Sequence, residues 1–105
     1  LRAAKTVIVP VELGCFSLVL ECIPEALAQK VTEILTIPTI GIGAGRYVDG
    51  QVLVINDLLG MNTDFKPKFL RTYWDGNLSI GEAINHFSGD VKNGEFPLAE
   101  ESYTE

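Results

Sequence analysis

Glu21 is the residue whose type and position most suggest chemistry. It closes the apolar run 15–20, which has the length and composition of a strand buried on both faces. A carboxylate at the end of a buried strand is either desolvated, which raises its pKa, or held by a cation or hydrogen-bond donors. Both situations are common in active sites. A structural ion pair with a lysine or arginine of a neighbouring strand stays open as the alternative.

A glycine-rich run, Gly41-Ile42-Gly43-Ala44-Gly45, is a second candidate. A dinucleotide-binding G-x-G-x-x-G motif would need glycine at position 46, where the chain has Arg46, and a helix should begin there. Asp49-Gly50 instead predicts a turn. We interpret the run as a backbone that closely approaches a ligand or a neighbouring strand, so a binding loop and a plain turn both remain open.

The other polar residues favour structural roles. Asn56 and Asp57 follow a third apolar run, and Asp57 is interpreted as a cap of the segment 58–60. His86 lies one residue from an apolar helical stripe and is expected at the surface. A basic cluster is interpreted as the solvated face of a short helix: Lys66, Lys68 and Arg71. No cysteine–histidine metal pattern or nucleophile–base pair is visible.

Three short apolar runs predict strands at 15–20, 39–42 and 51–55. Between the first two, a helix is predicted from Pro24, with the apolar stripe Leu27, Val31, Ile34 and Leu35. The link at 43–50 is too short for a helix, so an irregular loop must replace it. This order indicates an α/β fold with parallel strands. Three such strands cannot cover both their faces, so the unit is expected to be incomplete.

The second half of the chain is predicted to be mostly helical. Residues 66–73 form one expected helix. A second begins at a capping box, Ser79 with Glu82, and ends at Gly94. Its apolar positions are Ile80, Ala83, Ile84, Phe87 and Val91. The acidic tail 97–105 is expected to be extended. Residues 1–14 fit either a strand or the end of a helix capped by glycine.

Composition narrows the possible partners. The net charge of −6 and the pI near 4.6 argue against nucleic acid and anionic membranes. No stretch approaches the roughly 20 apolar residues of a membrane helix, and no secretory signal is visible. We expect a cytoplasmic protein whose cysteines, Cys15 and Cys22, are reduced core thiols. Because the chain opens with Leu1, we expect the gene product to extend upstream.

Several segments resemble the ketopantoate hydroxymethyltransferase family. They are LVLECIP at 18–24, IPTIGIGAG at 37–45, DGQVLV at 49–54 followed by DLLG at 57–60, FKPKFL at 65–70 and GEFP at 94–97. The resemblance runs from about Gly14 to the end. Two departures stand out. Asn56 occupies a position where the family often has histidine, and residues 6–10 do not resemble the helix that the family would have before the first strand.

The resemblance implies a (β/α)₈ TIM barrel with its active site at the carboxyl ends of the strands. Residues 1–105 would be one partial domain, supplying roughly the last three strands and the C-terminal helices. Glu21 matches the family's base, which takes a proton from C3 of 3-methyl-2-oxobutanoate. The enolate, stabilised by Mg²⁺ with ligands outside this chain, attacks 5,10-methylenetetrahydrofolate. The partners implied are a small-molecule keto acid, a folate and further copies in a homo-oligomer.

Two alternatives to this enzyme remain. The residues could form a non-catalytic binding or assembly module. A native polypeptide mass near 11.5 kDa would favour this alternative. They could also belong to another magnesium-dependent keto-acid lyase on a similar barrel. Dependence on a folate donor separates that lyase from the transferase.

Overall fold

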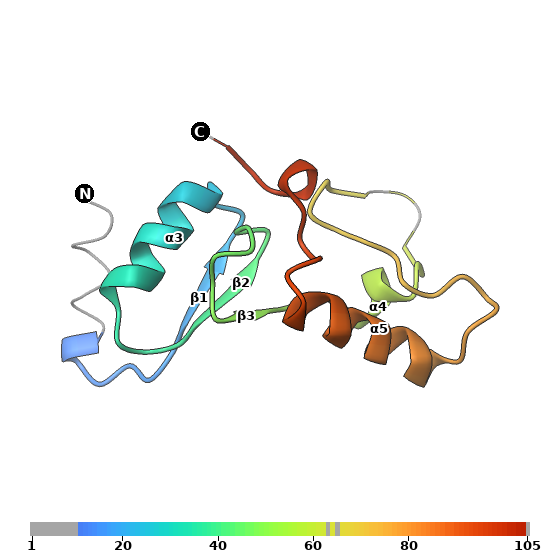
Figure 1. Ribbon diagram of the computed structural model, residues 1–105, viewed down its shortest axis with the longest axis horizontal. Coiled ribbons are helices and arrows are strands. Elements are labelled where there is room, and N and C mark those ends of the chain that lie inside the picture. The colour runs from blue at the N-terminus through green and yellow to red at the C-terminus, as the bar shows by residue number, and fades with distance from the viewer. Residues whose placement is uncertain (1–10, 63, 65, 105) are drawn as a thin grey trace.

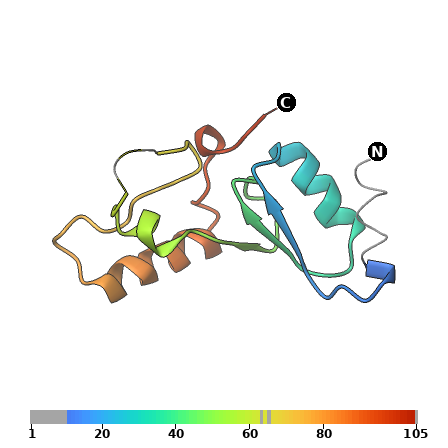
Figure 2. The same cartoon turned by 180° about the vertical axis from the view of Figure 1, so that it is seen from behind.

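A computed structural model of the chain describes residues 11–62, 64 and 66–104. Its order is β1 (Leu18–Glu21), α3 (Glu25–Ile34), β2 (Thr39–Ile42), β3 (Gly50–Gln51), α4 (Ile55–Leu58), α5 (Ile80–Lys92) and the 3₁₀ helix η1 (Ala99–Glu101). The sheet and α3 lie at one end of an elongated molecule, and α4 and α5 lie at the other (Figures 1 and 2). Of the two interpretations left open for residues 1–14, the strand, which rests on 6–9, falls outside the described residues.

The three strands form one parallel sheet in the order β1-β2-β3, which confirms the predicted parallel α/β arrangement. Glu21 pairs in register with Ile42, and Gly41 with Gln51. The carboxyl ends of all three strands therefore lie along one edge of the sheet. An irregular loop at 43–49 joins β2 to β3 without a helix, as expected.

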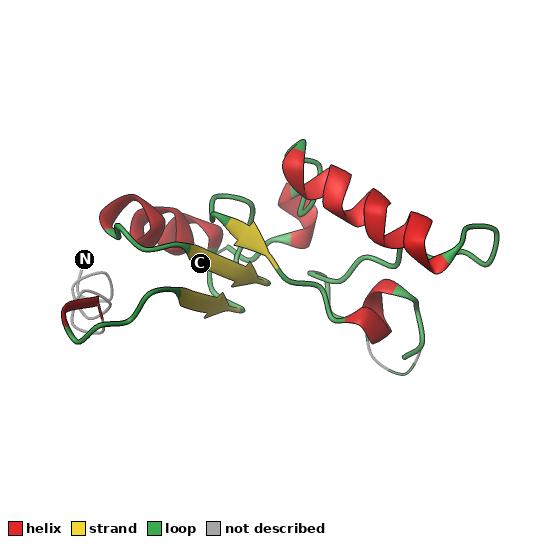
Figure 3. Cartoon of the chain, turned by 90° about the horizontal axis from the view of Figure 1, so that it is seen from below, coloured by secondary structure: helices red, strands yellow, loops and turns green. Residues whose placement is uncertain are grey.

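The first hydrophobic core lies between the sheet and α3, whose predicted range is confirmed within a residue or two. Its buried members are Leu20, Ala28, Val31 and Ala44. Figure 3 shows α3 on one side of the strands. Ile34, which the helical stripe placed in the core, is 48% exposed because it lies at the last turn.

The prediction that β1 is buried on both faces is wrong. Leu20 packs toward α3, whereas Val19 is 60% exposed. Side chains alternate across a strand, so Val19 and Glu21 share the face turned away from α3. The cysteines also differ from the prediction, because Cys15 and Cys22 are both exposed. Cys15 precedes the sheet and Cys22 follows it, so neither reaches the core.

The third strand is shorter than predicted. The last ladder bond runs from the Val52 N–H to the Gly41 carbonyl oxygen at 2.9 Å, and the chain then leaves the sheet. Ile55, placed in a strand by its apolar neighbours, begins α4 instead. Leu53 and Leu58 enter a second core, so packing at the other end of the molecule decides the conformation here.

The end of the chain contains one confirmed helix. Ser79 and Glu82 form the predicted capping box at the start of α5. At its end, the Glu95 N–H bonds the Asp90 carbonyl at 2.8 Å and the Gly94 N–H bonds that of Val91 at 3.2 Å, the pattern of a Schellman motif. The helix packs on the second core, which consists of Leu53, Leu58, Tyr73, Ala83 and Phe96. Ile80 and Ile84 of the predicted stripe are exposed.

Two predictions for this half are wrong. Residues 66–73 form a single turn followed by extended chain, because the Tyr73 and Trp74 N–H groups bond the Leu58 carbonyl oxygen at 2.8 and 3.2 Å. The tail is not simply extended. It contains η1, Ser102 is buried, and Tyr103 forms a parallel bridge with Pro24.

A buried hydroxyl at Thr39 joins the starts of β2 and β3 to α3. The Asp49 N–H donates to Thr39 Oγ1 at 3.3 Å, and the Thr39 N–H donates to Asp49 Oδ2 at 2.8 Å. Thr39 Oγ1 lies 2.8 Å from Thr32 Oγ1, which donates to the Ala28 carbonyl at 2.8 Å. This network holds β3 in register where the ladder itself is short.

We therefore expect Thr39→Val to destabilise the protein by about 1 kcal/mol, because valine keeps the shape and removes the hydroxyl that contacts the half-buried Thr32 and the exposed Asp49. Urea denaturation measures the loss. Thr72→Val is the matched control, since Thr72 is exposed and its hydroxyl makes only a long 3.5 Å contact. Equal losses in the two variants would contradict the role of the Thr39 hydroxyl.

Candidate functional site at the carboxyl edge of the sheet

Glu21 ends β1 at the carboxyl edge of the sheet, on the face that α3 leaves open. Its side chain is exposed, so the desolvation expected from the sequence is not present in the described chain. Among residues 11–62, 64 and 66–104, no ion pair includes Glu21. The structural ion pair considered as an alternative is therefore not formed within this part of the chain. The carboxylate remains available to a ligand.

A tight turn immediately after Glu21 fixes the direction of the chain. Cys22 has a φ of 51°, a left-handed conformation that costs a non-glycine residue energy. Its N–H donates to the Ile42 carbonyl oxygen at 2.9 Å. Three residues later α3 begins at Glu25, whose N–H donates to the Tyr103 carbonyl oxygen at 3.0 Å. The turn that carries Glu21 is thus anchored at both ends.

The glycine run forms the neighbouring part of this edge. Gly43 and Gly45 have φ values of 68° and 81°. A Cβ on Gly43 would lie 3.1 Å from the Phe69 ring and 3.2 Å from Cys22 Sγ, and one on Gly45 would lie 2.3 Å from Glu25 Cβ. Close approach to other parts of this chain therefore accounts for both glycines, and this supports the turn interpretation over a phosphate-binding loop.

Asn56 and Asp57 are not brought to Glu21. Both lie in α4, which packs near α5 at the far end of the molecule (Figure 1). The prediction that Asp57 caps the next segment is wrong, because Asp57 lies inside the helix and Val54 is its N-cap. His86 is exposed, as predicted. It lies 3.8 Å from an Asp90 carboxylate oxygen and meets the Tyr73 ring edge-on.

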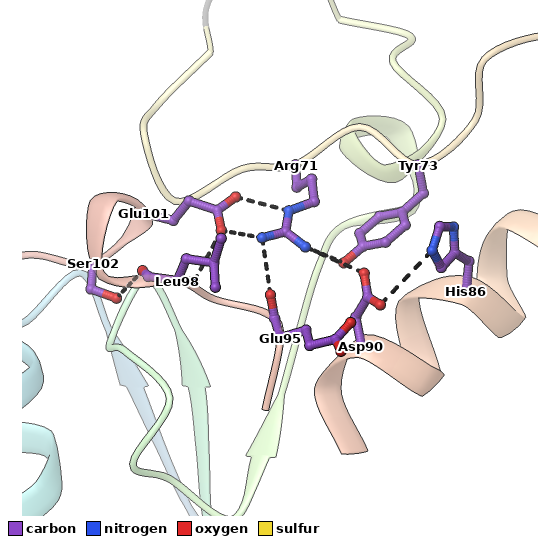
Figure 4. A network of polar contacts seen from close by, with 8 residues as sticks. All are labelled: Arg71, Tyr73, His86, Asp90, Glu95, Leu98, Glu101 and Ser102. Atoms are coloured by element: carbon purple, nitrogen blue, oxygen red, sulfur yellow. Dashed lines mark hydrogen bonds and ion pairs between the residues drawn. The ribbon is translucent and has the colours of Figure 1, made fainter. Parts of the chain in front are cut away.

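Arg71 is the polar centre that the sequence analysis missed (Figure 4). Instead of facing solvent on a helix, it forms two hydrogen bonds with the Glu101 carboxylate, Nε to Oε2 at 3.0 Å and Nη2 to Oε1. It also bonds Asp90 Oδ2 at 3.3 Å, the Glu95 carbonyl at 3.1 Å and the Tyr73 hydroxyl at 3.2 Å. The partners Asp90, Glu95 and Glu101 lie 19 to 30 residues away in sequence, so no local pattern identifies them.

The electrostatics of this centre follow from its contacts. The hydrogen bond with Glu101 raises the pKa of Arg71, which stays protonated. Burial raises the pKa of the Tyr73 hydroxyl, and the nearby Asp90 carboxylate acts in the same direction. Both groups therefore stay protonated around neutral pH. This suits a structural role, whereas a group that transfers protons must change its protonation state.

A cavity of about 340 Å³ lies away from Glu21. Residues 46–51, from the β2–β3 loop and β3, line one side, and Val91, Gly94 and Phe96, at and just after the end of α5, line the other. Glu21 is not among the lining residues. The candidate site is therefore defined by the sheet edge and not by this cavity.

The described residues do not fit a metal centre. Within 11–62, 64 and 66–104, no three or more side chains of histidine, cysteine, aspartate or glutamate gather as a metal ion requires. In the same part of the chain, none of the helices combines the length and apolar character needed to cross a membrane.

The comparisons with known proteins agree with one another. The model of the family "Ketopantoate hydroxymethyltransferase" matches residues 2–99. A 3-methyl-2-oxobutanoate hydroxymethyltransferase of Bacteroides fragilis is 60% identical over 92 residues, covering 88% of this chain and 34% of that protein. One of Francisella tularensis is 52% identical over 92 residues, covering 88% and 35%. The chain thus spans about a third of the length of the curated relatives it matches.

Proposed function

The chain belongs to the ketopantoate hydroxymethyltransferase family, and from this premise we propose that it works in hydroxymethyl transfer to a keto acid. The acceptor is 3-methyl-2-oxobutanoate, the donor is 5,10-methylenetetrahydrofolate and the product is 2-dehydropantoate, a precursor of pantothenate. The names of the relatives support the acceptor and the transferred group. The folate donor rests on the family resemblance.

Within this proposal, residues 1–105 are one partial domain that supplies the last three strands of a (β/α)₈ barrel. The uncovered sheet face supports this assignment. Parallel sheets are normally covered on both faces, yet Val19 is 60% exposed on the side away from α3. In a barrel this face would turn inward and pack against the other strands. We extend the proposal, from the resemblance alone, to a cytoplasmic homo-oligomer.

The position of Glu21 is the observation that carries the proposal. It ends β1 at the carboxyl edge, on the face that would point into the barrel, and no described cation pairs with it. Active sites of such barrels lie at the carboxyl ends of the strands. Further strands would exclude water from this carboxylate and hold it against the substrate, as a general base requires.

In the proposed reaction, a Glu21 carboxylate oxygen accepts the proton from C3 of the keto acid. The C3–H bond breaks, and its electron pair forms the enolate. C3 then bonds to the methylene carbon of the donor, and water supplies the hydroxyl oxygen. Both carbon–nitrogen bonds that hold this carbon to the folate break, and the two nitrogens take up the C3 proton, returned from Glu21, and one proton of the water. Mg²⁺ also remains a proposal from the resemblance. Because the described residues offer it no ligand cluster, no step is assigned to it here.

A donor-dependence assay tests this function. The complete protein is expected to convert 3-methyl-2-oxobutanoate to its hydroxymethyl product with 5,10-methylenetetrahydrofolate present, and to form none without it. Mass spectrometry of the keto acid measures the added CH₂O. Cleavage of a keto acid without the donor would indicate a lyase instead, and no turnover in either condition would contradict the transferase.

A further inference from the structure

We propose that the tail segment, residues 98–103, positions the proposed base Glu21, and that Arg71 holds this segment in place through Glu101. The inference rests on the proposed function, because it takes Glu21 as the group that removes the proton. It assigns Arg71 and Glu101 as positioning residues that touch no substrate. The connection runs from Arg71 to Glu101, through the backbone to Tyr103, and from there to the start of α3.

The first step is the cap that the tail segment provides to α3. A helix begins with four N–H groups that lack partners within it. Pro24 occupies the N-cap position and has no side-chain oxygen that could accept from them. The Tyr103 carbonyl oxygen accepts from the Glu25 N–H at 3.0 Å, and Tyr103 bridges Pro24. The tail segment therefore does what a serine or aspartate N-cap does in other helices.

The second step is the anchoring of the tail segment itself. Glu101 is 14% exposed and accepts both hydrogen bonds from Arg71, while its Oε1 also accepts from the Leu98 N–H at 3.0 Å. The Ser102 hydroxyl donates to the Leu98 carbonyl at 2.8 Å. The Glu101 side chain thus caps η1 and joins it, through Arg71, to the extended segment at 71–73 (Figure 4).

The third step links the cap to Glu21. Only Cys22 and Ile23 separate Glu21 from Pro24. Cys22 holds a strained left-handed conformation, which persists only where the surrounding structure fixes it. The sheet fixes one end of this turn and the Tyr103 carbonyl fixes the other. When the tail segment is released, the turn can relax and the Glu21 carboxylate can move away from the proton it must accept.

Arg71 also has a second branch, which provides a matched control. Its bond to Asp90 Oδ2 at 3.3 Å reaches α5 and not the tail segment. Asp90 and Glu101 are equally shielded, at 13% and 14% exposed. Glu101→Gln and Asp90→Asn each replace one of the two carboxylates that pair with Arg71 by a neutral amide. Only the first weakens the connection that leads to Glu21.

The test measures the kcat and KM of hydroxymethyl transfer and urea stability in the complete protein carrying either variant. A displacement of about 1 Å at a reacting group can cost about 100-fold in rate. For Glu101→Gln we expect a fall in kcat of about 10- to 100-fold with KM nearly unchanged. For Asp90→Asn we expect kcat within about twofold of the wild type, with a comparable loss of stability, because that branch does not lead to the reacting group.

Equal kcat values in the two variants at equal stability would overturn the positioning role. If Glu101→Gln does not fold, a chain ended after Ser102 removes the Tyr103 carbonyl and must show the same fall in kcat. Glu21→Gln, measured alongside, separates the two proposals. Full activity in Glu21→Gln would contradict the proposed function. Loss of activity in Glu21→Gln without loss in Glu101→Gln would contradict only the positioning role.

Discussion

Replacing Glu21 by glutamine in the complete protein is expected to lower kcat for hydroxymethyl transfer by about 10²- to 10⁴-fold, the usual contribution of a general base. Glutamine has nearly the shape of glutamate, so the fold at the end of β1 is preserved. Its amide cannot accept a proton at neutral pH. Steady-state kinetics with varied keto acid measures the effect, and KM is expected to change little because the lost interaction belongs to the transition state.

Glu33→Gln is the control for this variant. Glu33 is exposed on α3, away from the sheet edge, and carries the same charge. Its replacement is expected to leave kcat unchanged, which excludes a general effect of lowering the negative charge. A fall of similar size in both variants would remove Glu21 from its assigned role.

Gly45→Ala is expected to produce the largest loss of stability among the glycine substitutions. A left-handed φ of 81° costs a non-glycine residue about 1–2 kcal/mol. A Cβ at this position would also lie 2.3 Å from Glu25 Cβ and 3.1 Å from Glu25 Cα. Overpacking of this kind costs about 1–3 kcal/mol, so the total is about 2–5 kcal/mol, measurable by urea denaturation.

Gly76→Ala separates the two contributions. Gly76 has a φ of 88°, and a Cβ there would meet nothing within 4 Å. This variant should therefore lose only the backbone contribution of about 1–2 kcal/mol. If Gly45→Ala were no less stable than Gly76→Ala, the close packing of the β2–β3 loop on the first turn of α3 would be contradicted.

Local signals predicted the elements that depend on near neighbours in sequence. The strand at 39–42 is found with its predicted bounds, and Ser79 with Glu82 begins α5 as expected. Gly94 ends that helix with a φ of 74°. Each of these features is determined within a few residues, by a short apolar run, a cap or a left-handed glycine.

Features that depend on distant partners could not be predicted in the same way. Residues 66–73 have helical spacing, but the N–H groups of Tyr73 and Trp74 bond the Leu58 carbonyl oxygen at the end of α4. Arg71 pairs with Glu101, 30 residues away, and Tyr103 returns to the start of α3. These contacts determine the shape of the second half, and a single sequence does not reveal them.

The candidate site lies between these two cases. Its place at the carboxyl edge follows from the parallel order of the strands, and the register of Glu21 with Ile42 agrees with it. The burial of Glu21 does not follow from the strand order, because further strands are needed to cover the sheet face that carries it. The Cys22 turn and its anchor at Tyr103 were also missed, since both rest on contacts between segments far apart in the chain.

Exchange of the C3 proton shows directly whether Glu21 is the base. The complete protein is incubated with 3-methyl-2-oxobutanoate in deuterium oxide without a folate donor, and proton NMR follows the loss of the C3 signal. The wild type is expected to exchange this proton, and Glu21→Gln to exchange none above background while still binding the keto acid by calorimetry. Exchange at the wild-type rate in Glu21→Gln would contradict the account.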